Sequence, residues 1–174
     1  MMGVRDFTLH NWLLHYHTCD CQTTLITVIP KEQGNQIWGV GNGNPRRFGN
    51  YASALSSGVR IGSDSKLAGS NTLMWYLGSN LSFGTHRSRG LWKNAKNRYL
   101  GLKFVVKGTA THYGWARLSL VPYRNGHTTL VLTGYAYETI PGKPIVTGKT
   151  HGTHKATLGR LAQGASGVVS REKK

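Results

Sequence analysis

Cysteine, long apolar runs and acidic residues are all scarce in this sequence. Its 174 residues include only two cysteines, Cys19 and Cys21, which are separated by one residue, so no disulfide framework can join distant segments. No run approaches the ~20 apolar residues that a membrane-spanning helix needs, which excludes such a span. The first 30 residues also lack the basic region, apolar run and small-residue cleavage site of a signal peptide.

Acidic residues are the second shortage. Only six Asp and Glu stand against 22 Lys and Arg, which gives a formal net charge of +16. Between residues 33 and 171 the only acids are Asp64 and Glu138, so paired-carboxylate chemistry has almost no residues to use. No Gly-x-Ser-x-Gly nucleophile elbow is present either. We therefore expect no catalytic site and no cofactor.

The excess of positive charge indicates the kind of partner. A strongly basic surface attracts polyanions, so the sequence favours a polyanion or polysaccharide as the ligand. Nucleic acid is expected to bind weakly and non-specifically at most. The sequence leaves open the alternative that the charge serves solubility alone, because net charge is informative about association and not about fold.

Glycine and aromatic residues are abundant, and they are distributed as in a β protein. Residues 51–97 alternate short apolar patches with Gly, Ser and Asn, which is typical of short strands in a sandwich or barrel. Residues 98–107 alternate apolar and other residues, the pattern of a half-buried strand. Further strands are predicted over 112–121 and 128–137, joined by a turn at Asn125-Gly126. We predict an all-β fold, an antiparallel β-sandwich or jelly-roll-like domain.

The composition divides the chain into three parts. Residues 1–34 hold both cysteines and three of the eight histidines, and we interpret them as an appended, flexible segment. Residues 35–148 would form the β-sandwich domain. Residues 149–174 would form a Gly-rich basic tail with at most one short helix, because glycines interrupt its helical spacing. On this interpretation, deleting residues 1–30 leaves the core intact.

The predicted turn also fixes the register of the last hairpin. It pairs Arg124 with His127 and, further out, Leu118 with Thr133. Leu118 and Leu120 then lie on a face without charged residues, which we assign to the core.

Four residues gather at one end of the opposite face: Tyr113, Trp115, Arg117 and Glu138. A flat aromatic ring beside a guanidinium and a carboxylate is a candidate platform for a glycan or another small polar ligand. The alternative is structural, with Arg117 and Glu138 paired over a tryptophan that a loop covers.

A second candidate site lies near the N-terminus. His15, His17, Cys19 and Cys21 occupy alternate positions, so in an extended strand all four project from one face. Two imidazoles and two thiolates suit tetrahedral zinc. However, neighbouring same-face positions lie nearly 7 Å apart at a rise of about 3.3 Å per residue, so four in line surround one ion only if the chain bends sharply.

Several strings in the C-terminal half carry a family resemblance: Tyr99 to Phe104, His112 to Leu118, Gly134 to Thr139, and Pro144-Ile145 with Gly148. Together they resemble a family of uncharacterised exported bacterial proteins related to the PEP-CTERM type, which a C-terminal tail sorts to the cell exterior. The resemblance is strongest over residues 99–165. It implies an extracellular or cell-envelope β domain with no catalytic residues to carry over. The sequence ends in Arg171-Glu172-Lys173-Lys174 without a sorting motif, so export is expected from the resemblance alone.

Three functions remain as hypotheses. The first is a non-enzymatic extracellular or cell-envelope domain that acts by binding or structural association, with a glycan as one candidate ligand. The alternative is a basic nucleic-acid-binding module, in which cations neutralise phosphates and aromatic rings stack on bases; the sequence lacks an RNP signature and a groove-reading helix. The third is a metal-dependent enzyme that uses the N-terminal His and Cys residues.

Overall fold

The structure, a computed structural model, describes residues 6–16, 18, 21–41, 50–68, 72–80, 83–106, 110–122 and 128–150. Every regular element in this part of the chain is a strand, so the predicted all-β fold is confirmed. The strands are β1 (Phe7–Tyr16), β2 (Cys21–Pro30), β3 (Gln36–Gly41), β4 (Asn50–Ala52), β5 (Arg60–Ile61), β6 (Leu67–Ala68), β7 (Thr72–Asn80), β8 (Thr85–Arg89), β9 (Arg98–Val106), β10 (Ala110–Pro122), β11 (Thr128–Tyr137) and β12 (Ile145–Val146).

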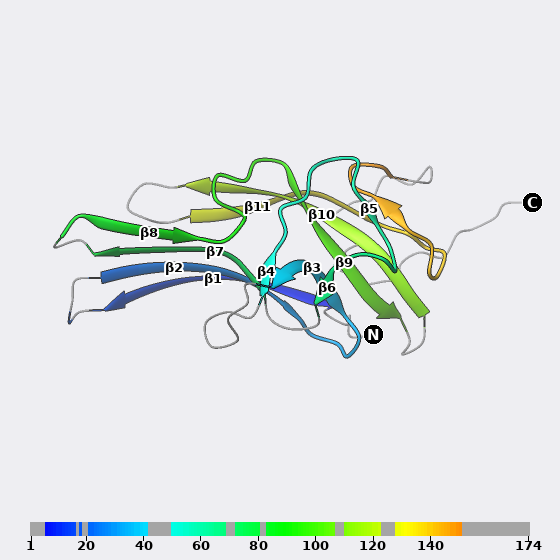
Figure 1. The fold of residues 1–174 in the computed structure, drawn as a ribbon, viewed down its shortest axis with the longest axis horizontal. Helices are drawn as coiled ribbons and strands as arrows, with labels where there is room; N and C mark the ends of the chain where they lie inside the picture. The colour runs from blue at the N-terminus through cyan, green and yellow to red at the C-terminus, as the bar shows by residue number, and fades with distance from the viewer. Residues whose placement is uncertain are drawn as a thin grey trace, which may run out of the picture.

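One large sheet contains most of these strands. Its order is β1-β2-β7-β4-β3-β9-β10-β11, with β8 beside β7 and β6 beside β3, while β5 and β12 form a separate pair. The described strand pairs are antiparallel except β4 and β7, which are parallel. Figure 1 shows β1, β2, β7 and β8 side by side in one half of the molecule, with β9, β10 and β11 crossing into the other. The two ends of the sheet meet where the Asn11 side-chain amide donates a hydrogen bond to the Thr128 carbonyl.

The main core is enclosed by this curled sheet. It consists of apolar side chains from strands of both halves and from the segment that joins β8 to β9. The buried members are Ile26, Val28, Ile37, Ala52, Met74, Trp92, Ala95, Leu100, Leu118 and Leu120. Burying such a surface from both halves of the chain is the main force that holds the sheet in its curled form.

Strands β1 and β2 belong to the large sheet and to this core, contrary to the expectation of an appended segment. β1 pairs with β2 along its whole length, and β2 pairs in turn with β7. Ile26 and Val28 of β2 have no exposed surface. The β-branched residues of β2 alternate between buried and partly buried positions. This alternation is typical of a strand, and it was present in the sequence although residues 1–34 were interpreted as an appended segment. The expected tail lies outside the described residues from position 151 onward.

The β10–β11 hairpin has the predicted register over half of its length. From Gly114 to Arg117 the partners on β11 are those that were predicted. Beyond this point Leu118 lies opposite Leu132 and not opposite Thr133, because β11 contains a β-bulge. Thr133 is the extra residue, and its hydroxyl accepts a hydrogen bond of 2.9 Å from Nε of Arg117. The predicted turn itself lies outside the described residues.

A second apolar cluster lies on the other face of β9 and β10. Its buried members are Ile61, Tyr99, Tyr113, Trp115 and Ile145. The β5–β12 pair supplies Ile61 and Ile145 and covers this face of the large sheet (Figure 1). Tyr99, Leu100 and Gly101 of β9 are consequently all buried, whereas the sequence predicted a half-buried strand.

Thr147, just after β12, fastens this cover to the rest of the molecule. Its fully buried hydroxyl accepts a hydrogen bond of 2.8 Å from the Val59 N–H and donates one of 2.7 Å to the Ser56 carbonyl. The Thr147 N–H also donates to the Val59 carbonyl at 2.9 Å. Buried polar groups that are satisfied in this way fix the position of the chain at no net desolvation cost.

Candidate functional site

The predicted ligand platform is mostly covered. Tyr113, Trp115 and Glu138 are only 4%, 5% and 7% exposed. The Trp115 ring packs edge-on against Tyr99 with a centroid separation of 5.1 Å, and its indole N–H donates to the Lys149 carbonyl at 3.3 Å. This arrangement corresponds to the structural alternative, in which another part of the chain covers the tryptophan.

Arg117 and Glu138 do not pair with each other as that alternative supposed. Arg117 donates to the hydroxyl and the carbonyl of Thr133, at 2.9 and 3.0 Å, and so fastens the bulge. The Glu138 carboxylate lies 3.3 Å from the Lys143 ammonium and accepts a hydrogen bond of 3.2 Å from the Ile140 N–H. Both residues hold local backbone in place, and ligand binding by the four platform residues stays a prediction.

The electrostatics of Glu138 agree with a structural role. Burial by itself raises the pKa of a carboxyl group. Here the hydrogen bonds from the Ile140 backbone and from Lys143, together with the Lys143 charge, outweigh burial and lower the pKa of Glu138 below its ordinary value of 4.5. The side chain is therefore held as a carboxylate, whereas a general acid at neutral pH needs a raised pKa.

One of the four residues of the predicted zinc site, Cys21, is not available as a thiolate ligand. His17 and Cys19 lie outside the described residues, and His15 is opposite Gln22 in the β1–β2 pair. Cys21 is disulfide-bonded, and Cys19 is the only other cysteine of the chain. A disulfide sulfur is not the thiolate that zinc binds. In the described part of the chain no three His, Cys, Asp or Glu side chains gather where they could hold a metal.

The structure instead gathers positive charge on the segment between β8 and β9. This segment repeats a three-residue pattern twice, Trp92-Lys93-Asn94 and Ala95-Lys96-Asn97, in which the apolar residue is buried and the lysine exposed. The two asparagines have φ angles of 56° and 52°, a left-handed conformation that asparagine tolerates better than most residues. Each asparagine thus turns the chain so that the next apolar residue points inward and the lysines stay outside.

Hydrogen bonds hold this segment against the sheet. The indole N–H of Trp92 donates to the Ala52 carbonyl at 3.0 Å inside the core. The backbone N–H of Asn97 donates to the Ser119 hydroxyl on β10 at 2.9 Å. A cation on an ordered backbone loses less conformational freedom on binding than one on a mobile loop, so the two lysines are well placed to bind an anion.

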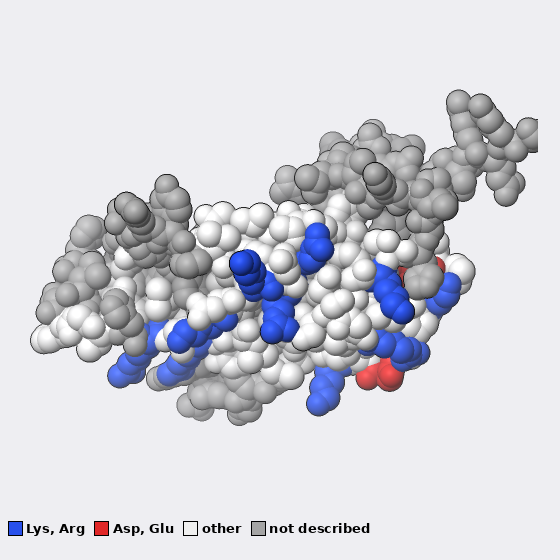
Figure 2. Space-filling model, turned by 90° about the horizontal axis from the view of Figure 1, so that it is seen from above, with Lys and Arg blue, Asp and Glu red and all other residues white. Residues whose placement is uncertain are grey.

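Arginines on both sides extend this positive surface. We call the set Arg87, Arg89, Lys93, Lys96 and Arg98 the basic strip; all five are exposed. No Asp or Glu occurs between residues 65 and 137, so the strip has no acidic neighbour in the sequence. Figure 2 shows Lys and Arg side chains recurring along one face of the molecule, with the visible acidic side chains toward one end.

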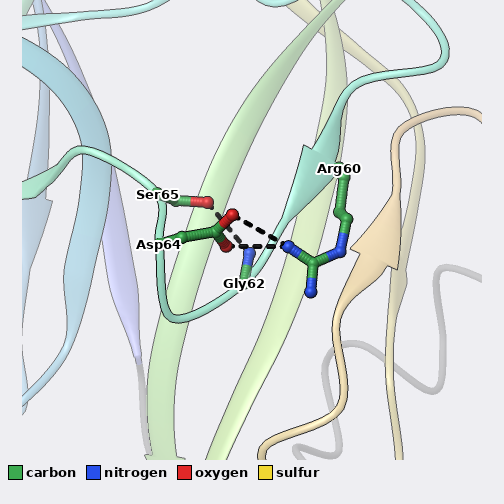
Figure 3. Close-up of polar contacts among 4 residues, drawn as sticks. All are labelled: Arg60, Gly62, Asp64 and Ser65. Atoms are coloured by element: carbon green, nitrogen blue, oxygen red, sulfur yellow. Dashed lines mark hydrogen bonds and ion pairs between the residues drawn. The ribbon is translucent and has the colours of Figure 1, made fainter.

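Asp64, an exposed acid outside the strip, is occupied by a local partner. It follows β5 in a tight turn that the Gly62 N–H and the Ser65 hydroxyl close with a hydrogen bond of 2.9 Å. One guanidinium nitrogen of Arg60 lies 2.8 and 3.0 Å from the two Asp64 carboxylate oxygens (Figure 3). An exposed pair of this kind contributes about 0–1 kcal/mol, but it does balance the Asp64 charge on the surface.

Sequence reasoning missed the basic strip although a signal was present. Five of the twelve residues from 87 to 98 are Lys or Arg and none is acidic. A search for contiguous charged runs does not find this segment, because other residues separate the five cations.

Comparison with known proteins does not extend these observations. No family model, curated protein or solved structure matches the chain. The resemblance to the exported family therefore stays a prediction. Within the described ranges, no helix has the length and apolar character required to cross a membrane.

Proposed function

We propose that this protein is a non-enzymatic binding domain of the cell exterior or cell envelope, and that its ligand is an anionic polysaccharide held on the basic strip. The observation that carries the proposal is the Trp92–Asn97 segment, whose buried anchors present two exposed lysines from an ordered backbone. The charge of +16 adds long-range attraction for any polyanion.

A separate observation, the disulfide at Cys21, supports a location outside the cytoplasm. Cys21 is disulfide-bonded, and disulfides persist mainly in oxidising compartments such as the cell exterior and the periplasm. Alkylation of thiols in intact cells tests this point, since a reduced Cys21 in the protein's own compartment contradicts the proposed location.

The binding experiment compares two variants of equal charge. Lys93→Gln/Lys96→Gln removes two charges from the strip, and Lys31→Gln/Lys66→Gln removes two exposed charges elsewhere. Titration calorimetry with dextran sulfate, using neutral dextran as the blank, measures the affinity of each protein across a series of salt concentrations. We expect the strip variant to bind about tenfold more weakly, from roughly 0.5–1 kcal/mol per exposed contact, and with a shallower salt dependence.

Three outcomes decide against the proposal. Wild-type protein that does not bind dextran sulfate excludes a polyanion-binding function. Equal weakening in both variants shows that total charge and not the strip governs affinity. Tighter binding to a single-stranded oligonucleotide than to the polysaccharide, at matched salt, supports the nucleic-acid-binding module instead.

A further inference from the structure

The outward face of β1, β2, β7 and β8 carries aromatic and hydroxyl residues that the hypotheses so far have not used, beside Arg87 and Arg89 of the basic strip. Side chains alternate across a strand, and Ile26 and Val28 of β2 point into the core. The pairing of the strands therefore places two rows of residues on the opposite face. One row is Trp12, Leu25, Tyr76 and Arg89, and the other is Leu14, Thr23, Gly78 and Arg87.

This face is exposed, aromatic and basic. Trp12 is 47% exposed and stacks on His10 with a centroid separation of 5.3 Å. Arg87 and Arg89 are exposed, and neither forms an ion pair with an acid in the described part of the chain. The sequences of the four strands contain no Asp or Glu, so no carboxylate of this face competes for the guanidinium groups.

An open hollow of about 280 Å³ lies within this face, and a glycine forms part of its lining. Its lining includes Thr23, Tyr76, Gly78, Thr85 and Arg87. The Tyr76 side chain folds along its own strand toward Gly78, where an added β-carbon would meet first the Tyr76 hydroxyl and then Cζ of the ring, at 2.9 Å. Glycine at position 78 therefore leaves room for the distal end of the Tyr76 side chain, and both residues line the hollow.

The chemistry of the lining defines the ligand. An aromatic face packs against the apolar face of another ring, and threonine hydroxyls both donate and accept hydrogen bonds. The planar guanidinium of Arg87 matches a carboxylate with two parallel hydrogen bonds. A sugar ring that bears hydroxyls and one carboxylate can contact the tyrosine ring, the threonine hydroxyls and the arginine guanidinium at the same time.

We infer that this hollow binds one hexuronate ring of an acidic polysaccharide, with the ring on Tyr76, ring hydroxyls on Thr23 and Thr85, and the carboxylate on Arg87. The inference rests on the proposed function and deepens it by naming the sugar. Arg87 is itself part of the basic strip, so following anionic groups of the same polymer bind on the rest of the strip. Hydroxyl side chains in the lining and the disulfide at Cys21 favour a sugar over a nucleobase.

The test separates recognition of a uronate from attraction to any polyanion. The probes are an alginate trisaccharide, the same trisaccharide with its carboxylates reduced to alcohols, and dextran sulfate. Arg87→Lys keeps the charge but loses the planar fork, Tyr76→Ala removes the ring, and Tyr76→Phe keeps the ring without its hydroxyl. Affinities come from titration calorimetry on the full chain, with thermal melts to confirm folding.

We expect Arg87→Lys to bind the alginate trisaccharide at least about tenfold more weakly, as the loss of one hydrogen bond to a charged group typically gives. Tyr76→Ala should also bind it more weakly, because the ring that packs against the sugar is removed. Binding of dextran sulfate should change less than about twofold, because the charges of the strip are kept. Tyr76→Phe should stay within about threefold of wild type, because the stacking face is retained. If Tyr76→Ala does not fold, Arg87→Lys on the exposed strand still decides the question.

Each result that contradicts the inference is distinct from failure of the proposed function. Wild-type binding to dextran sulfate without binding to the trisaccharide removes the uronate hollow and leaves the basic strip. Equal affinity for the trisaccharide and its reduced form shows that Arg87 does not read the carboxylate. An oligonucleotide that loses affinity in Tyr76→Ala when the trisaccharide does not assigns the hollow to a base.

Discussion

Replacing Trp115 with alanine tests whether the second apolar cluster is part of the folded core. Trp115 is 5% exposed, packs edge-on against Tyr99, and donates its indole N–H to the Lys149 carbonyl. A buried tryptophan hides roughly 150–250 Å², which at about 25 cal/mol per Å² corresponds to about 4–6 kcal/mol. Because alanine keeps a small part of this area and the site relaxes, we expect a loss of about 3–5 kcal/mol.

Urea unfolding followed by far-ultraviolet circular dichroism measures this loss, and another tryptophan provides the control. Trp12 is 47% exposed on the outer face of β1, so Trp12→Ala should cost less than about 1 kcal/mol. A Trp115→Ala variant that loses under 1 kcal/mol, or no more than Trp12→Ala, refutes the conclusion that the β5–β12 pair covers a second part of the core. In that case Tyr113 and Trp115 are again candidates for the ligand platform that the sequence predicted.

Two further predictions concern the N-terminal strands and pH. Deleting residues 1–30 should abolish cooperative unfolding, because β2 places Ile26 and Val28 in the core; a shortened chain that still melts cooperatively contradicts the sheet order. Glu138→Gln should destabilise the protein by about 1–3 kcal/mol at neutral pH, from loss of a charged hydrogen-bond acceptor. Since the pKa of Glu138 is lowered on folding, its contribution is complete above its ordinary value of 4.5 and is lost as the pH falls through the lower folded value. The difference between wild type and Glu138→Gln should therefore shrink below pH 4.5, and a difference that grows there contradicts the pKa shift. Comparing the two proteins cancels the effect of Asp6, whose pKa burial raises and which acts in the opposite direction.

The predicted site illustrates what a sequence pattern can place. The alternation along β10 correctly put Tyr113, Trp115 and Arg117 on the face opposite Leu118. The pattern could not show that residues 55–61 and 145–149 cover this face, because that cover depends on contacts between segments distant in the sequence. Likewise, the hydrogen bonds of Arg117 to Thr133 depend on a β-bulge, and no turn residue in the sequence predicts that bulge.

The outer face that carries Tyr76 and Arg87 is a candidate site that the sequence pattern did not predict. The sequence gives no sign that the two residues act together, because they lie on different strands. Gly78 looks like an ordinary glycine that interrupts the apolar pattern of β7. Pairing of β7 with β2 and β8 brings Tyr76 and Arg87 together, and Gly78 then matters because it leaves room for the distal end of the Tyr76 side chain.

The sequence by itself determined the all-β class, the three long strands from Arg98 to Tyr137 and the charge that favours an anionic partner. These properties follow from local alternation and composition, which act over a few residues or over the chain as a whole. Only the tertiary structure decided that β1 and β2 are part of the core, that Trp115 is covered and that the basic strip faces outward. Each of these depends on which strands become neighbours, and that choice is made by burial of apolar surface between residues far apart in the chain.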